Sequence, residues 1–346
     1  AWPERTGIAS GARRRGDRVI RRRDFLAVLS VTATWASGAR AQQGARVRRL
    51  GLATGIMDEA GTRARYTALF AELARLGWTE GRNLQIDYRW GEGRDSDMRR
   101  NAQELAALAP DVIVVTGGAT LGSLLEKTRA VPIVFALVPD PVGSGFIDSL
   151  SHPGGNATGF AQFEYSVSGK WLDLLKEVAP GIKRAAVLWD PKLPAGIGQF
   201  AIIQSVAPAL GVDVIPIKPG TPSELDEALY AFAAAGNGGL IVTSYPQAVV
   251  QREAIAAMAA RHKLPAVYST RDFVASGGLL SYAADFIDQY RLAAGYVDRI
   301  LRGDKPADLP VQTPTKYQLV INLKTARAMS ISVPTSLLAR ADEVIE

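Results

Sequence analysis

The sequence predicts an α/β protein built from two doubly wound parallel sheets. The chain has 346 residues, which suits two domains of ordinary size. Short β-rich runs alternate with amphipathic helical segments, and this alternation occurs twice along the chain. One run, residues 111–115, is almost entirely apolar, as a strand covered on both faces requires. Strand–helix alternation of this kind gives parallel sheets with right-handed crossovers.

The first half of the alternation opens with a strand. The predicted strands are 47–54, 83–90, 111–115 and 132–137, and the predicted helices are 63–76, 97–109 and one from about 119. In the first helix Tyr66, Leu69 and Leu73 recur at the spacing of one buried face. Gly77 is expected to cap this helix, and Pro110 to stop the next one.

The strand–helix alternation begins again after a glycine-rich boundary at residues 154–159. The predicted strands are 184–189, 213–217, 239–243, 265–268 and 279–282, and the predicted helices are 171–178, 200–210, 223–235, 249–261 and 286–301. Gly211 is expected to cap one helix, and Ser223 with Asp226 resembles the capping box that opens the next.

Residues 1–41 have the features of an export signal. They hold nine arginines and three acids, so the whole formal net charge of +6 lies in this segment. The arginines at 21–23 precede an apolar run at 25–36 that is too short to span a membrane, and Ala39-Arg40-Ala41 follows as a cleavage site. We therefore expect a twin-arginine signal peptide, cleavage near Ala41 and a periplasmic mature protein. One alternative is the general secretory route, and another is a basic arm that stays attached.

Composition and motifs exclude most catalytic machinery. The chain has no cysteine, which removes disulfides, thiolate metal sites and a cysteine nucleophile. His152 and His262 are its only histidines, and both lie in settings typical of structural residues. No G-x-S-x-G elbow or phosphate-binding loop occurs. We expect no catalytic residue, no bound metal and no cofactor.

Ligands of parallel sheets bind beyond the carboxyl ends of the strands, where this chain is rich in hydroxyls, glycine and aromatics. The candidate ligand-binding residues are Thr54, Thr116, Gly117, Thr120, Asp140, Phe163, Asp190, Ser244, Tyr245 and Tyr268.

Each candidate has a functional and a structural interpretation. Thr116 and Gly117 open a helix whose N-terminus favours a carboxylate, but the same residues also make an ordinary cap and turn. Asp140 follows an apolar strand and suits either a ligand ammonium group or the start of a short helix, and Asp190 is a similar case. The aromatic residues suit stacking on a flat ligand or packing in the core.

Several segments, in order, resemble the ABC-transporter substrate-binding protein family whose better-known members bind tryptophan or related aromatic amino acids. They are Leu-Gly-Trp-Thr-Glu-Gly-Arg-Asn at 76–83, Pro-Ile-Val-Phe at 132–135, Asp-Pro-Val at 140–142, Pro-Gly-Gly-Asn-Ala-Thr-Gly at 153–159, the run 314–326 and Ala-Asp-Glu at 341–343. The resemblance covers about residues 46–346.

The resemblance implies a type I periplasmic-binding fold, in which two α/β lobes are joined by a hinge of three crossovers. Lobe 1 would comprise residues 46–160 with about 285–308, and lobe 2 would comprise 161–284 with about 309–346. By position, Thr116 and Gly117 would hold a ligand carboxylate, and Asp140 would meet an amino group. Members of the family deliver a small solute to a membrane permease and catalyse no reaction.

We therefore expect an exported solute-binding component of an ABC importer, which captures a small carboxylate-bearing solute such as an amino acid by hinge closure. One alternative is an enzyme on the same architecture. Another is the effector-binding lobe pair of a transcription regulator, which would need a helix-turn-helix ahead of the first strand. Beyond the leader the chain is net neutral, so we expect no nucleic-acid partner and no membrane insertion of the mature chain.

Overall fold

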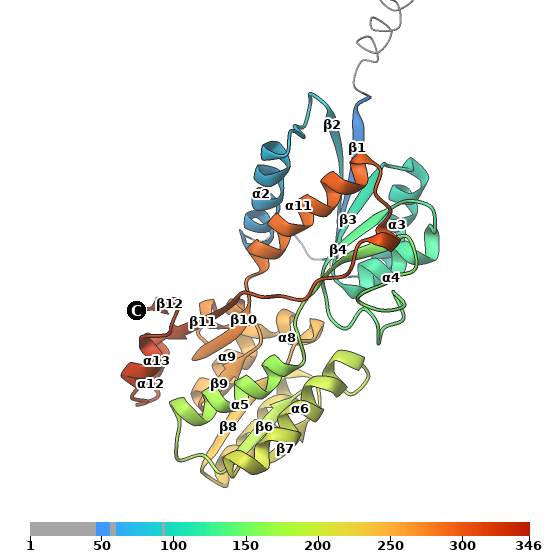
Figure 1. Ribbon diagram of the computed structural model, residues 1–346. Coiled ribbons are helices and arrows are strands. Elements are labelled where there is room, and N and C mark those ends of the chain that lie inside the picture. The colour runs from blue at the N-terminus through green and yellow to red at the C-terminus, as the bar shows by residue number, and fades with distance from the viewer. Residues whose placement is uncertain (1–45, 56–59, 92–93) are drawn as a thin grey trace, which may run out of the picture. The chain divides into compact units, whose positions relative to one another are not determined.

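The structure is a computed structural model that describes residues 46–55, 60–91 and 94–346 (Figure 1). The predicted signal peptide, residues 1–41, lies outside the described residues. Residues 47–346 form one compact unit, and the description below concerns this unit.

The first sheet has five parallel strands in the order β2-β1-β3-β4-β5. They are β1 (Arg48–Thr54), β2 (Leu84–Trp90), β3 (Val112–Thr116), β4 (Ile133–Val138) and β5 (Ala157–Ala161), with helices α2 (Ala60–Arg75), α3 (Asp95–Leu108), α4 (Gly118–Lys127) and α11 (Phe286–Arg302). Helices α2 and α11 cover one face, and α3 and α4 cover the other (Figure 1). Strand β3 is buried throughout, which explains its almost unbroken apolar run.

The second sheet has seven strands in the order β12-β11-β10-β9-β8-β6-β7. They are β6 (Arg184–Leu188), β7 (Asp213–Ile217), β8 (Gly238–Val242), β9 (Ala266–Tyr268), β10 (Leu280–Ala284), β11 (Tyr317–Asn322) and β12 (Glu343–Ile345). Its helices are α5 (Ser166–Val178), α6 (Pro194–Leu210), α7 (Pro222–Ala234), α8 (Pro246–Val250), α9 (Arg252–Arg261), α10 (Arg271–Ala275), α12 (Leu323–Ala328) and α13 (Thr335–Leu338). All neighbouring strands are parallel except β10 and β11, so the predicted doubly wound α/β class is confirmed with one antiparallel pair.

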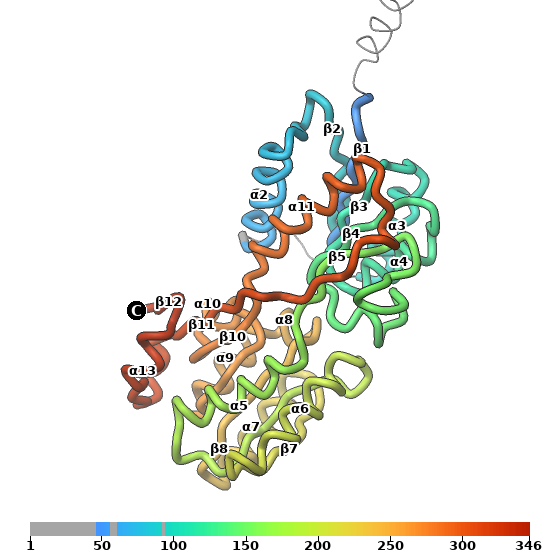
Figure 2. Tube along the Cα trace, viewed as in Figure 1, coloured from blue at the N-terminus to red at the C-terminus, as the bar shows by residue number. Residues whose placement is uncertain are grey.

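The chain passes between the two sheets three times: after β5, after β10 and after Gln312 (Figure 2). These crossover segments are hydrogen-bonded to one another. The Asp285 amide donates to the Lys316 carbonyl at 3.0 Å, and beside these segments Gln289 Nε2 on α11 donates to the Ala161 carbonyl at the end of β5 at 3.1 Å. Thr313 Oγ1 donates to Glu164 Oε1 at 2.6 Å. The three passages therefore form one connected strip between the sheets.

Most predicted elements are present, although α5 and α6 begin five and six residues before the predicted starts at 171 and 200. The predicted helix 249–261 is two helices, α8 and α9, which are separated at Gln251. The glycine-rich boundary at 154–159 holds β5, a strand that the glycines concealed. The predicted cap at Ser223 and Asp226 is wrong. Thr221 and Glu224 form the capping box of α7, since Thr221 Oγ1 accepts from the Glu224 amide and Glu224 accepts from the Thr221 amide.

Thr221→Ala is expected to lower the free energy of unfolding by about 1 kcal/mol, because it leaves the Glu224 amide in the first turn of α7 without a side-chain acceptor. Ser223→Ala is the matched control, because Ser223 is exposed inside the same first turn. Urea unfolding of both variants measures the difference. Equal losses in the two variants would contradict the assigned cap.

Candidate functional site

The carboxyl edge of the first sheet brings together four predicted site residues. Thr54 and Thr116 are paired neighbours at the ends of β1 and β3, and both are buried. Thr116 Oγ1 is hydrogen-bonded to the hydroxyl groups of Tyr66, at 3.2 Å, and Tyr290. Gly117 has a φ of +83°, which glycine adopts readily, and its amide donates to the Ala136 carbonyl. The polar atoms of the Thr-Gly turn therefore have partners within the protein.

The remaining member of this group, Thr120, lies one turn into α4. Its buried Oγ1 is 3.6 Å from the sulfur of Met98 on α3. A Cβ added at Gly55, just after β1, would lie 3.1 Å from the same oxygen. Thr120 is thus closely packed between α3 and the end of β1.

Asp140 follows β4 in a left-handed conformation, with a φ of +41°. One carboxylate oxygen accepts from the Gly143 amide at 2.8 Å, and the other accepts from the Tyr165 hydroxyl at 2.7 Å. Burial raises the pKa of Tyr165, and the hydrogen bond from its hydroxyl to Asp140 raises it further. Asp140 therefore links the end of the first sheet to Tyr165, which directly precedes α5.

Tyr165→Phe is expected to lower the free energy of unfolding by about 1–2 kcal/mol, because it removes a hydrogen bond to a carboxylate. Tyr230→Phe is the matched control, since that side chain on α7 is 66% exposed. Chemical denaturation of the two variants measures how far each substitution lowers the free energy of unfolding. A Tyr165→Phe loss no larger than the control's would contradict the assigned role of this bond.

The carboxyl edge of the second sheet holds Asp190, Ser244 and Tyr245. Asp190 Oδ1 accepts from the Lys192 amide at 2.9 Å. Burial raises the pKa of Tyr245, and the negative charge of Asp190 adds to the increase. Ser244 Oγ accepts from Gln162 Nε2 at 2.9 Å, which joins the end of β8 to the first crossover segment.

Tyr268, like Tyr245, is buried in the apolar core of the second sheet. It is 1% exposed and stacks on Phe273, with ring centroids 4.8 Å apart. It belongs to the apolar core on one side of the second sheet. Tyr268 thus packs in this core, and the residue after it, Ser269, lines the pocket described next.

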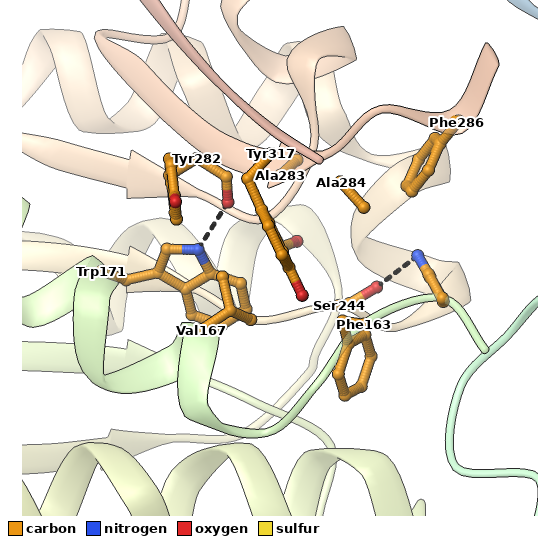
Figure 3. A pocket seen from close by; sticks show the side chains of 11 residues that line it. Phe163, Val167, Trp171, Ser244, Tyr282, Ala283, Ala284, Phe286 and Tyr317 are labelled. Atoms are coloured by element: carbon orange, nitrogen blue, oxygen red, sulfur yellow. Dashed lines mark hydrogen bonds between the residues drawn. The ribbon is translucent and has the colours of Figure 1, made fainter. Parts of the chain in front are cut away.

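A narrow pocket lies where the three crossover segments meet the second sheet (Figure 3). Its aromatic lining residues are Phe163, Trp171, Tyr282, Phe286 and Tyr317, and its polar lining residues are Gln162, Ser244 and Ser269. The space open to the centre of a water-sized sphere is about 10 Å³, about enough for one water molecule. A larger ligand would require the surrounding segments to move apart.

Four buried polar atoms at the carboxyl edge of the second sheet have no hydrogen-bond partner among the described residues. They are Trp189 Nε1, the Tyr245 hydroxyl, Ser269 Oγ and Thr270 Oγ1. These residues follow β6, β8 and β9, three adjacent strands. A buried polar atom without a partner costs about 1–3 kcal/mol, so each such group calls for an explanation, such as a ligand that supplies the bond. The four atoms therefore mark this edge as a candidate ligand site.

Sequence analysis missed Arg65. Its side chain is only 14% exposed, and its guanidinium lies 5.2 Å from the ring centroid of Phe286. Arg65 Nη2 is 3.7 Å from Asp272 Oδ2 on α10, so this ion pair connects a first-sheet helix to a second-sheet helix. Arg65 stands four and eight residues before Leu69 and Leu73, on the buried stripe of α2. The signal available in the sequence was a charged residue at the spacing of the buried apolar face of α2.

Within residues 46–55, 60–91 and 94–346, no group of three or more carboxylate and histidine side chains is placed to hold a metal ion. In the same part of the chain, no helix is both long enough and apolar enough to cross a membrane.

Comparisons with known proteins identify relatives along most of the chain. A tyrosine-binding protein of Clostridioides difficile (strain R20291) is 24% identical over 261 residues, which cover 74% of this chain and 73% of that protein. A conserved domain protein of Vibrio cholerae is 25% identical, with a TM-score of 0.77 over 86% of this chain and all of that chain. An ABC domain from Streptococcus pneumoniae in complex with L-Trp is 23% identical, with a TM-score of 0.78 over 86% of this chain and 99% of that chain.

These structural similarities confirm a fold of the periplasmic-binding-protein kind. The family model described as ABC transporter substrate binding protein matches residues 53–345, which is most of the chain. The family is one of solute-binding proteins and not of enzymes. The chain therefore belongs to the ABC transporter substrate-binding protein family.

Proposed function

We propose that this chain is the exported solute-binding component of an ABC importer, and that it binds a small amino-acid solute between its two lobes. Lobe 1 comprises residues 46–160 with about 285–308, and lobe 2 comprises 161–284 with about 309–346. The supporting observation is the cluster of four unpartnered buried polar atoms at the carboxyl edge of the second sheet. A solute with several hydrogen-bonding groups would supply their partners.

The aromatic lining of the pocket supports an amino acid with a flat side chain. Phe163, Trp171, Tyr282, Phe286 and Tyr317 present five rings around one narrow space (Figure 3). Flat apolar groups are bound well by such rings through stacking and edge contacts. The tyrosine-binding relative and the structural neighbour with bound L-Trp support the same class of solute.

The mechanism we propose is hinge closure without a chemical step. The three crossover segments form the only covalent connections between the lobes in residues 94–346, and they are tied together by hydrogen bonds. Closure would bury the solute and create the surface that a membrane permease recognises. Thr54, Thr116, Gly117, Thr120 and Asp140 would contribute from lobe 1. Phe163, Asp190, Ser244 and Tyr245 would contribute from lobe 2 and the first crossover.

The proposed location follows from the leader and the family. Residues 1–41 would direct export and be cleaved near Ala41, which would leave the mature protein in the periplasm. Mass spectrometry of the protein recovered from the periplasm tests the cleavage.

A thermal-shift screen of the chain with amino acids, aromatic carboxylates, purines and sugars tests the proposed function. A ligand at a hundred times its dissociation constant stabilises a protein by about 2.7 kcal/mol, which raises the melting temperature by a few degrees. We expect stabilisation by L-tryptophan, L-tyrosine or another amino acid, with no turnover of the bound compound. Stabilisation by sugars or purines alone would contradict the proposed solute class.

A further inference from the structure

Two opposite charges meet at the boundary between the two sheets. Arg65 lies on α2, which packs on the first sheet, and Asp272 lies on α10, which packs on the second. Their side chains are 14% and 37% exposed, so both charges are partly withdrawn from water. Among the described residues, this is the ion pair that joins the two sheets' helices.

The ion pair leaves most of the hydrogen-bonding capacity of Arg65 unused. The 3.7 Å between Arg65 Nη2 and Asp272 Oδ2 exceeds the 2.7–2.9 Å of a charge-assisted hydrogen bond. A guanidinium has five N–H donors in a planar fork that matches a carboxylate. The described residues give this guanidinium no hydrogen bond, and it lies over the ring of Phe286, which lines the pocket.

At the edge of the first sheet, the Thr-Gly turn and Asp140 already have partners within the protein. The Thr116 hydroxyl is hydrogen-bonded to Tyr66 and Tyr290, and the Gly117 amide donates within the sheet. Both oxygens of Asp140 already accept hydrogen bonds. Arg65 and Asp272, by contrast, are opposite charges whose 3.7 Å separation leaves room for further hydrogen bonds.

Resting on the proposed function, we propose that Arg65 and Asp272 recognise the two charged groups of a zwitterionic α-amino acid. The guanidinium of Arg65 binds the carboxylate, and the carboxylate of Asp272 binds the ammonium group. A zwitterion places its carboxylate against Arg65 and its ammonium group against Asp272, and it leaves the net charge of the site unchanged. A solute with only one of the two groups leaves one partner unpaired and brings a like charge near the other, which is costly in a partly desolvated place. Because the pair spans the two lobes, the bound amino acid also holds them together.

Isothermal titration calorimetry of the chain with three related probes tests this assignment. L-tryptophan carries both charged groups, L-tryptophanamide lacks the carboxylate, and indole-3-propionate lacks the ammonium group. We expect the wild-type chain to bind L-tryptophan at least about tenfold more tightly than either analogue. This is the loss expected when one charged hydrogen-bonding partner is removed.

Two variants separate the roles. Arg65→Met is expected to bind L-tryptophan and L-tryptophanamide with similar affinity, while it still discriminates against indole-3-propionate. Asp272→Asn is expected to show the reverse pattern. Each variant keeps its preference for L-tryptophan over one of the two analogues, which shows that it is folded. Arg75→Met, at an exposed arginine on the same helix, is the matched control and should keep the wild-type pattern.

The outcomes distinguish this inference from the proposed function. One outcome is that the wild-type chain binds L-tryptophan, while both variants still bind it more tightly than L-tryptophanamide and more tightly than indole-3-propionate. In that case the assignment of Arg65 and Asp272 is wrong and the proposed function stands. If the wild-type chain binds none of the three probes, an aromatic amino-acid solute is contradicted, and this inference is contradicted with it.

Discussion

Trp171→Ala is expected to lower the free energy of unfolding by about 3–5 kcal/mol. Trp171 is buried on α5 against the second sheet, and its ring forms part of the pocket wall. Its indole Nε1 donates to the Tyr282 carbonyl at 2.7 Å (Figure 3). Alanine removes the apolar contacts, leaves a cavity and leaves that carbonyl without its donor. Urea unfolding followed by circular dichroism measures the loss.

Trp171→Phe separates the two contributions. Phenylalanine keeps most of the ring packing but cannot donate, so the expected loss is smaller, about 1–3 kcal/mol. A loss below about 1 kcal/mol for Trp171→Ala would show that α5 does not depend on this residue, contrary to its burial. In that case the pocket wall would be more adaptable than its packing indicates.

Gly159→Ala is expected to lower the free energy of unfolding by about 3 kcal/mol or more. Gly159 lies in β5 with a φ of +151°, and a Cβ at this position would overlap the carbonyl oxygen of Phe135 in β4. The neighbouring backbone is fixed by sheet pairing and cannot yield easily. The Gly159 carbonyl also accepts from the Gln312 amide, so displacement would disturb the start of the third crossover segment. The steric overlap and the unfavourable backbone conformation therefore both contribute to the loss of stability.

Gly155→Ala is the matched control for this substitution. A Cβ at Gly155 would meet no atom within 4 Å, and its φ lies outside the left-handed region. We expect its free energy of unfolding to stay within about 0.5 kcal/mol of the wild-type value. Similar midpoints of denaturation for the two variants would contradict the close approach of β4 and β5.

The fold was predictable because local patterns were strong and consistent. Apolar runs such as 111–115 had to be covered on both faces, and the amphipathic spacing of 63–76 fixed the buried side of α2. The antiparallel pairing of β11 with β10 was not predictable, because β11 follows the third crossover and its direction is set by tertiary packing. The strand β5 was hidden by glycines whose role is close backbone approach.

The candidate site was predictable at the level of strand ends and not at the level of individual contacts. The positions of Ser244 and Tyr245 after β8 follow from the general location of ligand sites in parallel sheets. The partners of Thr116 come from α2 and α11, which lie 50 and 174 residues away in sequence. Such pairings depend on how helices pack across the sheet. Tyr268 had the pattern of a strand-end aromatic, and only its burial shows that it faces the core.

The central claim, closure of two lobes around an amino-acid solute, is tested most directly by a distance measurement between the lobes. The sequence has no cysteine, so cysteines introduced at exposed positions 126 on α4 and 197 on α6 can be spin-labelled selectively. Electron–electron double resonance then gives the distance distribution with and without saturating L-tryptophan. We predict a shift to shorter distances on addition of the solute. An unchanged distribution, under conditions in which L-tryptophan raises the melting temperature, would contradict hinge closure as the mechanism.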